Sequence, residues 1–401
     1  MEIFNNPFRP GPGQSPPYLA GRQKEHDDFK VLLAQNPVMK NLIITGLRGV
    51  GKTVLLESLK PIAINEGWFW AGTDWSESAN VSEEILGIRI LTDLSAVASS
   101  FSIAYPTEET VGYVPEIKNK ETTLDYYTLL GIYNATPGLD SDKLKNVLEI
   151  IWNAIKGNSQ GIVLAYDEAQ NMKDNASDKQ FPLSVLLEVV QYLQRKEIPY
   201  LLVLTGLPTL FPNLVETRTY AERMFQVLTL EKLNEDESRE AITKPTQQNN
   251  CPVVFNENGI NGIIEYSGGY PYFIQFLCKE SFDLLLQQVK SGMPVNKHSV
   301  TIRDTLRKLD SDFYSGRWDS ITDRKRDLLI VIAKLPSANN EFTVQEITAK
   351  AKEVGEAKFT PSYINQILSK LIDSGFIYKN GHGKYLFAVP MMADFINRHS
   401  E

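Results

Sequence analysis

The sequence is poor in cysteine and in long apolar runs, and it has no excess of positive charge. Its 401 residues include only two cysteines, Cys251 and Cys278, too few and too isolated for a disulfide framework or a structural zinc site. No apolar run approaches the roughly 20 residues that cross a bilayer. The amino terminus has neither a basic start nor a continuous apolar stretch, so it does not resemble a secretory signal. We therefore expect a cytoplasmic protein with no membrane partner.

The formal net charge of −8 excludes a general electrostatic attraction to DNA. Any nucleic-acid binding would have to depend on a local basic patch. Hydrophobic residues make up 42% and charged residues 22%, a balance typical of folded globular proteins. The length favours two or three domains rather than one.

One short stretch carries the clearest chemistry. The sequence GLRGVGKT fits the phosphate-loop pattern, with glycines that let backbone N–H groups face a polyanion. In this pattern Lys52 reaches the β- and γ-phosphates of a nucleotide, and Thr53 offers its hydroxyl to Mg²⁺. The predicted nucleotide-binding residues here are Gly46, Leu47, Arg48, Gly49, Val50, Gly51, Lys52, Thr53 and Val54.

The context of the loop is that of an α/β domain with a parallel sheet. Short apolar runs predict strands at 41–45, 67–74, 161–167, 200–205 and 226–230. Helical patterns separate them at 53–59, 82–99, 141–156 and 183–195. We expect an ATPase-type α/β domain at 1–230, with an insertion at about 100–140 where periodicity fades.

After residue 230 the predicted strands stop. Helix punctuation at Asn234, Asn256, Gly268 and Pro271 predicts a helical lid domain over 231–295. A linker is expected at 296–320. Three helices and an aromatic hairpin then predict a winged helix-turn-helix domain over 321–401.

Two carboxylates follow the predicted strand at 161–166. Asp167 is placed to hold Mg²⁺, and alternation along an extended chain would turn Glu168 toward the γ-phosphate, where it activates water. The alternative is an acidic pair that only caps the end of a strand. A glutamate beside the magnesium carboxylate favours hydrolysis of ATP over transfer of phosphate to a metabolite.

Three further residues are candidates with an open alternative. Thr205 ends the next apolar strand and either senses the γ-phosphate or bonds to a turn. Arg218 or Arg223 either supplies positive charge to a neighbouring subunit's nucleotide or forms surface ion pairs. The sequence does not choose between the two arginines.

Together with SGGYPYFIQF and the terminal winged helix, these motifs resemble the AAA+ ATPases related to origin-recognition initiators, and also the STAND signalling ATPases. The resemblance implies Walker A and Walker B roles for the phosphate loop and for Asp167–Glu168. It implies that Thr205 is a sensor, that Arg223 is an arginine finger, and that Pro271 packs near the nucleotide. The segment PPYLAGR would place Tyr18, Leu19 and Arg22 near the adenine.

One departure from the resemblance concerns the lid, where many AAA+ motors carry an arginine at the start of the helix. Tyr270, Pro271 and Tyr272 stand there, which favours a slow or partner-stimulated switch over a motor. For the side chain of Arg48 three alternatives stay open: contact with phosphate, with a neighbouring subunit, or with solvent only.

Two functions remain open. In the first, an ATP-dependent switch binds double-stranded DNA through 321–401 and forms a homo-oligomer. Its DNA contacts would be Ser362, Tyr363, Gln366, Lys370, Lys379, His382 and Lys384. In the second, a signalling ATPase uses the winged helix and the insertion to bind proteins. A metabolic kinase is a weaker third reading, because it leaves the winged helix unexplained.

Overall fold

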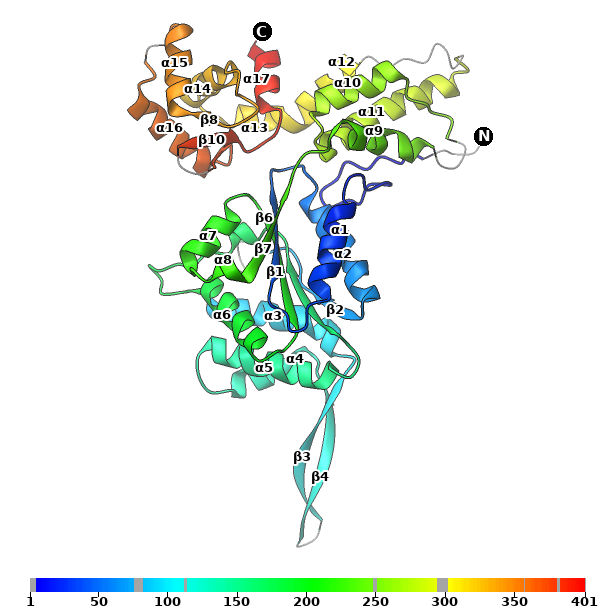
Figure 1. Ribbon diagram of the computed structural model, residues 1–401, viewed down its shortest axis with the longest axis vertical. Coiled ribbons are helices and arrows are strands. Elements are labelled where there is room, and N and C mark those ends of the chain that lie inside the picture. The colour runs from blue at the N-terminus through cyan, green and yellow to red at the C-terminus, as the bar shows by residue number, and fades with distance from the viewer. Residues whose placement is uncertain are drawn as a thin grey trace. The chain divides into compact units, whose positions relative to one another are not determined.

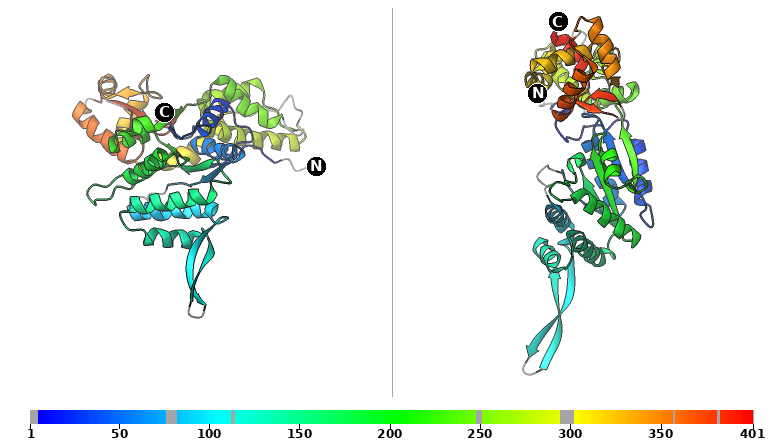
Figure 2. Two further views of the ribbon diagram at one scale, coloured as in Figure 1. Left: turned by 60° about the horizontal axis from the view of Figure 1, so that its bottom comes forward. Right: turned by 90° about the vertical axis from the view of Figure 1, so that its left-hand side faces the viewer.

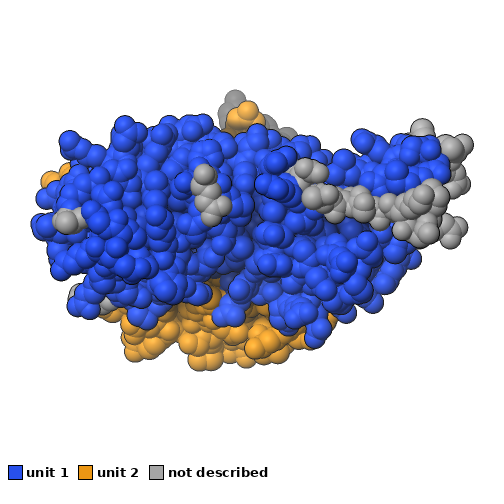
Figure 3. All heavy atoms as spheres, turned by 90° about the horizontal axis from the view of Figure 1, so that it is seen from above, with its two compact units in different colours: residues 1–22, 46–54, 230–401 blue, residues 23–45, 55–229 orange. Residues whose placement is uncertain are grey.

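The computed structural model describes residues 5–75, 82–111, 114–247, 251–293, 302–356, 358–380 and 383–400. The chain divides into two compact units (Figure 3). Unit 1 comprises residues 1–22, 46–54 and 230–401, and unit 2 comprises residues 23–45 and 55–229. This division differs from the consecutive segments expected from the sequence. It does so because the amino-terminal Phe8 and Ala20 belong to the same hydrophobic core as the lid helices.

A five-stranded sheet with the order β2-β5-β6-β1-β7 forms the centre of unit 2. The pairings β2 with β5, β5 with β6, and β6 with β1 are all parallel. The strands are β1 (Asn41–Gly46), β2 (Trp68–Ala71), β5 (Gly161–Tyr166), β6 (Tyr200–Gly206) and β7 (Phe225–Leu230). Strands β1, β5 and β6 are buried along their whole length, as expected for a sheet covered on both faces. The predicted parallel α/β sheet is confirmed.

Helices flank this sheet, with α1 and α2 on one side and α6 on the other (Figure 1). The helices are α1 (Gln23–Leu33), α2 (Lys52–Asn65), α3 (Glu83–Ala98), α4 (Tyr126–Ala135), α5 (Asp140–Ile155), η2 (Ala169–Asn171), α6 (Pro182–Arg195), α7 (Leu210–Thr217) and α8 (Ala221–Met224). Ser82 caps α3 by accepting a hydrogen bond from the backbone N–H of Ile85. Helix α2 begins at Lys52, directly after the phosphate loop, as the motif requires.

The segment expected as an insertion, at about 100–140, has regular secondary structure. It contains the antiparallel hairpin of β3 (Ser102–Val111) and β4 (Val114–Thr123), followed by α4. Figures 1 and 2 show the hairpin extending away from α3, α4 and α5. A ribbon that leaves the body of its unit needs no alternation of apolar and polar residues, which explains why the sequence carried no strand signal.

Unit 1 contains the predicted lid helices. They are α9 (Glu235–Thr243), η3 (Lys244–Thr246), α10 (Glu257–Ser267) and α11 (Pro271–Lys290). Asn234 and Asn256 cap α9 and α10, Gly268 ends α10 with φ +58°, and Pro271 opens α11. Each boundary follows the predicted punctuation, because capping depends on local residues alone.

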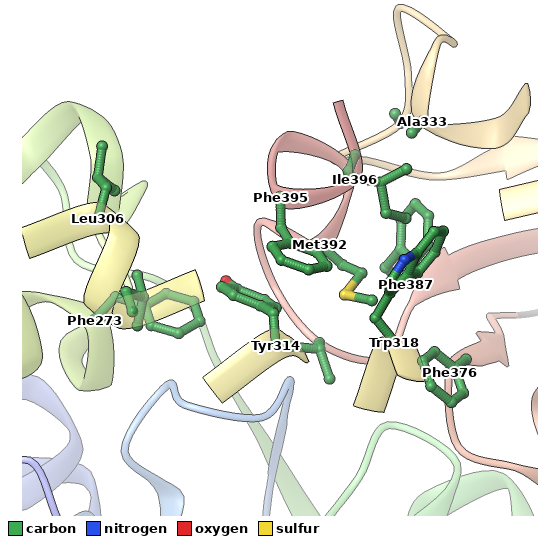
Figure 4. Close-up of a cluster of buried hydrophobic side chains, with 14 of the residues drawn as sticks. Phe273, Leu306, Tyr314, Trp318, Ala333, Phe376, Phe387, Met392, Phe395 and Ile396 are labelled. Carbon is green, nitrogen blue, oxygen red and sulfur yellow. The ribbon is translucent and has the colours of Figure 1, made fainter. Parts of the chain in front are cut away.

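The segment expected as a linker at 296–320, for which the sequence left the structure open, is helical over most of its described residues. It forms α12 (Ile302–Leu309), a π-helix η5 (Asp310–Ser315) and α13 (Gly316–Asp319). The helix α12 was not predicted, although it buries Leu306 and Leu309. Tyr314 and Trp318 are buried in the core of unit 1 (Figure 4).

The carboxy-terminal part has the predicted three helices and hairpin. These elements are α14 (Asp323–Ala333), α15 (Val344–Glu353), α16 (Pro361–Asp373), β9 (Ile377–Lys379) and β10 (Lys384–Phe387). Two further elements, β8 (Phe342–Thr343) and α17 (Met392–Ser400), were not predicted; β8 completes a three-stranded sheet with the order β8-β10-β9. Of the predicted turn, Gly381 and His382 lie outside the described residues.

Candidate nucleotide-binding site

The phosphate loop joins β1 to α2 through backbone conformations that require glycine. Gly49 and Gly51 have φ values of +79° and +91°, in the left-handed region that side chains disfavour. At Gly46 an added Cβ would lie 2.6 Å from the carbonyl oxygen of Leu230. The Nζ of Lys52 donates hydrogen bonds to the carbonyl oxygens of Gly46 and Leu47, at 3.0 and 2.9 Å. The ammonium group therefore lies inside the turn of the loop, where a phosphate would be received.

Arg22 braces the loop from the amino-terminal segment. Its guanidinium donates to the carbonyl oxygens of Gly21, Val50 and Glu231, at 3.1, 3.2 and 3.1 Å. Only 7% of this arginine is exposed. The resemblance placed Arg22 near the adenine, whereas its hydrogen bonds here hold together the loop and the start of the lid.

The lid touches the loop at the start of α11. The backbone N–H of Tyr272 donates to the carbonyl oxygen of Gly49 at 3.2 Å. A Cβ added at Gly49 would lie 3.4 Å from the Cβ of Tyr272. Pro271 occupies the first position of α11 and is half-buried, as is Leu19. The hydroxyl of Tyr18 donates to Oε2 of Glu240 on α9 at 2.9 Å, which ties the amino-terminal segment to the lid.

In unit 2, Asp167 and Thr205 meet where β5 and β6 end. Asp167 follows β5 directly and is 3% exposed, and Thr205 in β6 is fully buried. Oδ1 of Asp167 accepts hydrogen bonds from the hydroxyl of Thr205 and from the backbone N–H of Glu168. Because β1, β6 and β5 run parallel, their carboxyl ends share one edge of the sheet. The phosphate loop starts from that edge, since it continues β1.

Glu168 departs from the extended conformation on which its predicted direction depended. Its φ is +50°, so the chain turns at this residue and the expected alternation of side chains does not apply. The side chain is exposed, and its Oε2 accepts a hydrogen bond from Nε2 of Gln170. Oε1 of Gln170 in turn accepts from the backbone N–H of Leu207 at 3.1 Å, just beyond β6. Gln170 thus connects Glu168 to the strand that carries Thr205.

Sequence reasoning missed Asp74, which pairs with Asp167 through an isolated parallel bridge. The backbone N–H of Trp75 donates to the carbonyl oxygen of Asp167 at 2.9 Å. Burial and the negative charges of Asp167 and Glu168 raise the pKa of Asp74, while Arg89 opposes this. A carboxylate just after β2, the neighbour of β5, is the signal that would have found it.

The two candidate finger arginines are both exposed. Arg218 follows α7 and Arg223 lies in α8, and no ion pair to either is formed within the part of the chain that the structure describes. The backbone carbonyl of Arg223 accepts a hydrogen bond from Nζ of Lys40 at 2.8 Å. The choice between the two arginines stays open.

Most predicted DNA-contacting side chains are exposed. Ser362, Gln366 and Lys370 lie on the exposed face of α16, and Lys379 is exposed on β9. Tyr363 is half-buried and stacks on Phe359, with ring centroids 6.0 Å apart. Nζ of Lys384 donates a hydrogen bond to Oε2 of Glu341 at 2.5 Å. This ion pair neutralises part of the positive charge of the predicted wing.

Solved structures with the same fold span almost the whole chain. A Walker-type ATPase of Pyrococcus abyssi matches with a TM-score of 0.57 and 17% identity, over 94% of this chain and 96% of that one. The ORC2 protein of Aeropyrum pernix, solved as ADPNP–ADP complexes, matches with a TM-score of 0.55 and 12% identity, over 97% and 96%. Its ADP form matches equally well, over 97% of both chains. The chain therefore shares its fold with a Walker-type ATPase and an ORC2 protein, which confirms the predicted resemblance to origin-recognition ATPases at the level of the fold. The resemblance to the STAND ATPases stays a prediction.

A family model described as a domain of unknown function (DUF8462) matches residues 311–396. The comparison with curated proteins finds no match. None of the helices in the described segments combines the length and apolar character needed to cross a bilayer.

Proposed function

We propose that this protein binds Mg²⁺-ATP at residues 46–54 and hydrolyses it as a molecular switch. The observation that carries the proposal is the loop itself, in which Gly49 and Gly51 adopt left-handed conformations and Lys52 turns its ammonium group inward. Backbone N–H groups and the start of α2 would hold the phosphates, and Lys52 would neutralise the β- and γ-phosphates.

The donor groups of Thr53 and Asp167 fit a magnesium ion. Mg²⁺ is usually held by one or two carboxylates together with substrate phosphates, and it takes only oxygen ligands. A hydroxyl from Thr53 and a carboxylate from Asp167 meet that requirement. When bound, the ion would neutralise charge on the phosphates. The hydrogen bond from Thr205 would fix the orientation of Asp167 and link it to the γ-phosphate sensor role proposed for Thr205.

Glu168 would accept a proton from the attacking water. It lies on the turn immediately after Asp167, and Gln170 holds its carboxylate by a hydrogen bond. The lid offers Tyr270 and Tyr272 around Pro271 where motors carry an arginine, which supports slow or partner-stimulated hydrolysis rather than continuous turnover. Arg223 would act as the finger for a neighbouring subunit, with Arg218 as the alternative.

The proposed partner of the winged helix is double-stranded DNA. The exposed Ser362, Gln366 and Lys370 on α16 provide polar and positive groups of the kind that contact phosphates and base edges. The ion pair of Lys384 with Glu341 reduces the positive charge, so we propose weak, salt-sensitive binding.

The alternative is a signalling ATPase whose winged helix contacts proteins. The projecting hairpin β3-β4 supports this alternative, because a ribbon with open edges offers a surface for another chain. One experiment separates the two functions: ATP turnover and particle size measured together, with and without duplex DNA, at two salt concentrations. DNA-stimulated turnover that weakens with salt supports the DNA-binding switch. If DNA does not change ATP turnover and the nucleotide stays bound to the protein, the signalling ATPase is supported.

A further inference from the structure

Arg48 lies at the end of the phosphate loop that a terminal phosphate would occupy. It is exposed, and its neighbour Leu47 accepts a hydrogen bond from the ammonium group of Lys52. In phosphate loops this lysine meets the β- and γ-phosphates. The side chain of Arg48 therefore starts from the part of the loop that faces the γ-phosphate rather than the base.

A second arginine, Arg317 on α13, approaches the loop through a chain of ring contacts. The backbone N–H of Tyr272 bonds Gly49 in the loop, and the ring of Tyr272 lies 5.2 Å from the ring of Phe313. The guanidinium of Arg317 lies over that same Phe313 ring, 5.8 Å from its centroid. The aromatic pair thus sets Arg317 beside the loop.

The two arginines carry positive charges that nothing in the described chain balances. Burial and the charge of Arg48 lower the pKa of Arg317. No carboxylate of the described residues forms an ion pair with Arg48 or Arg317. The exposed Arg48 and the half-buried Arg317 carry like charges that repel each other. A phosphate between them would be held by charge-assisted hydrogen bonds from two planar donors.

The segment that carries Arg317 is also part of the core of the winged-helix region. The ring of Tyr314 stacks on Phe395 at 4.9 Å, and its hydroxyl donates to the carbonyl oxygen of Pro390 at 2.9 Å. Trp318, next to Arg317, packs against Phe395 with ring centroids 6.2 Å apart. Figure 4 shows Tyr314 and Trp318 among the side chains of α17. A displacement of Arg317 would therefore be transmitted to residues 390–396.

We propose that Arg48 and Arg317 together bind the terminal phosphate of a nucleoside triphosphate, and that Arg317 thereby reports the state of the nucleotide to the winged-helix region. The inference rests on the proposed function, because it requires a triphosphate in the loop. Many AAA+ motors carry an arginine at the start of the lid helix, where this chain has Tyr270 and Tyr272. Here Arg317 on α13 would contact the terminal phosphate instead. The same phosphate would also give Arg48 a role.

The test compares the binding of ADPNP, a non-hydrolysable triphosphate, with the binding of ADP, both in the presence of Mg²⁺. We expect R317Q to weaken ADPNP binding by about tenfold or more, the loss of a charge-assisted hydrogen bond, and ADP binding by less than about threefold. R48Q should show the same selectivity, and R317K should recover part of the loss. The matched control R324Q removes an exposed arginine of α14 and should change neither affinity.

The melting temperature without nucleotide shows whether R317Q weakens binding only because it destabilises the fold. Removing one of two repelling charges should leave the melting temperature of R317Q equal to or above that of the unaltered protein. Equal loss of ADPNP and ADP binding, no loss of either, or a clearly lower melting temperature without nucleotide would overturn the inference. If the unaltered protein binds neither nucleotide, the proposed function itself fails. If it binds both and R317Q does not discriminate, only this inference fails.

Discussion

The hydroxyl of Thr205 donates a hydrogen bond to Oδ1 of Asp167, and both side chains are almost completely buried. The two residues lie in and directly after neighbouring parallel strands, so the sheet itself sets their separation. A buried carboxylate with a fixed oxygen is a prepared ligand for a cation. The hydrogen bond fixes the orientation of the Asp167 carboxylate, and we propose that Thr205 thereby positions it to bind Mg²⁺.

Replacing Thr205 with valine keeps the shape of the side chain and removes the hydrogen bond. A buried carboxylate that loses one donor forfeits about 1–3 kcal/mol, so we expect ATP turnover to fall by about tenfold or more. The variant T205S keeps the hydroxyl and should retain most of the activity. Equal turnover in T205V and the unaltered protein, measured by phosphate release, would remove Thr205 from the site.

Glu168→Gln tests the assignment of the general base. The amide cannot accept the proton of water, so we expect hydrolysis to fall by about 10²- to 10⁴-fold while ATP still binds. Binding and single-turnover hydrolysis should be measured on the same preparation. If E168Q hydrolyses ATP at the rate of the unaltered protein, another residue activates the water. Asp74, which forms a bridge with Asp167, is then the next carboxylate to replace.

Arg22→Met distinguishes bracing of the loop from contact with adenine. The guanidinium makes three hydrogen bonds to carbonyl oxygens, so its loss should destabilise the protein without nucleotide by about 1.5–3 kcal/mol. The readout is a lower melting temperature in the absence of ATP. The control R9M removes an exposed arginine of the same amino-terminal segment and should leave the melting temperature unchanged. A normal melting temperature for R22M with weakened ATP binding would favour the adenine contact instead.

Glu280 on α11 predicts how the stability of the protein depends on pH. Burial alone would raise its pKa, but hydrogen bonds and charges from Lys308 and Lys279 outweigh burial and lower it. Because the folded-state pKa is depressed, the stabilisation is complete above the ordinary glutamate value of about 4.3 and disappears as pH falls through the folded-state value.

We therefore expect E280Q to melt at a lower temperature than the unaltered protein at pH 7, by a difference worth about 1 kcal/mol. The gap should close as pH falls below about 4. The variant E265Q, which changes an exposed glutamate of α10, provides the comparison. A gap that stays constant down to low pH would show that the ion pairs with Lys279 and Lys308 are not its source.

The sequence predicted those features that depend on neighbouring residues along the chain. The phosphate loop, the buried strands β1, β5 and β6, and the helix boundaries at Asn234, Asn256 and Pro271 all follow from local patterns. Contacts between distant segments were not predictable in this way. Asp74 reaches Asp167 only because β2 pairs with β5, and Arg22 reaches Val50 only through the folded chain.

One local expectation was also wrong, for a physical reason. The chain turns at Glu168, so the alternation of an extended segment does not hold there. The sequence analysis left the structure of 296–320 open, and the helices α12 and α13 bury Leu306 and Trp318 there.

Single-turnover hydrolysis of ATP, measured with enzyme in excess and Mg²⁺ present, shows whether this protein is an ATPase. It detects even slow hydrolysis and needs no partner. We predict that the unaltered protein releases phosphate from ATP and that Lys52→Ala neither binds ATP nor releases phosphate. Phosphate release at the same rate from both proteins would contradict the proposed ATPase site. So would an unaltered protein that neither binds ATP nor releases phosphate.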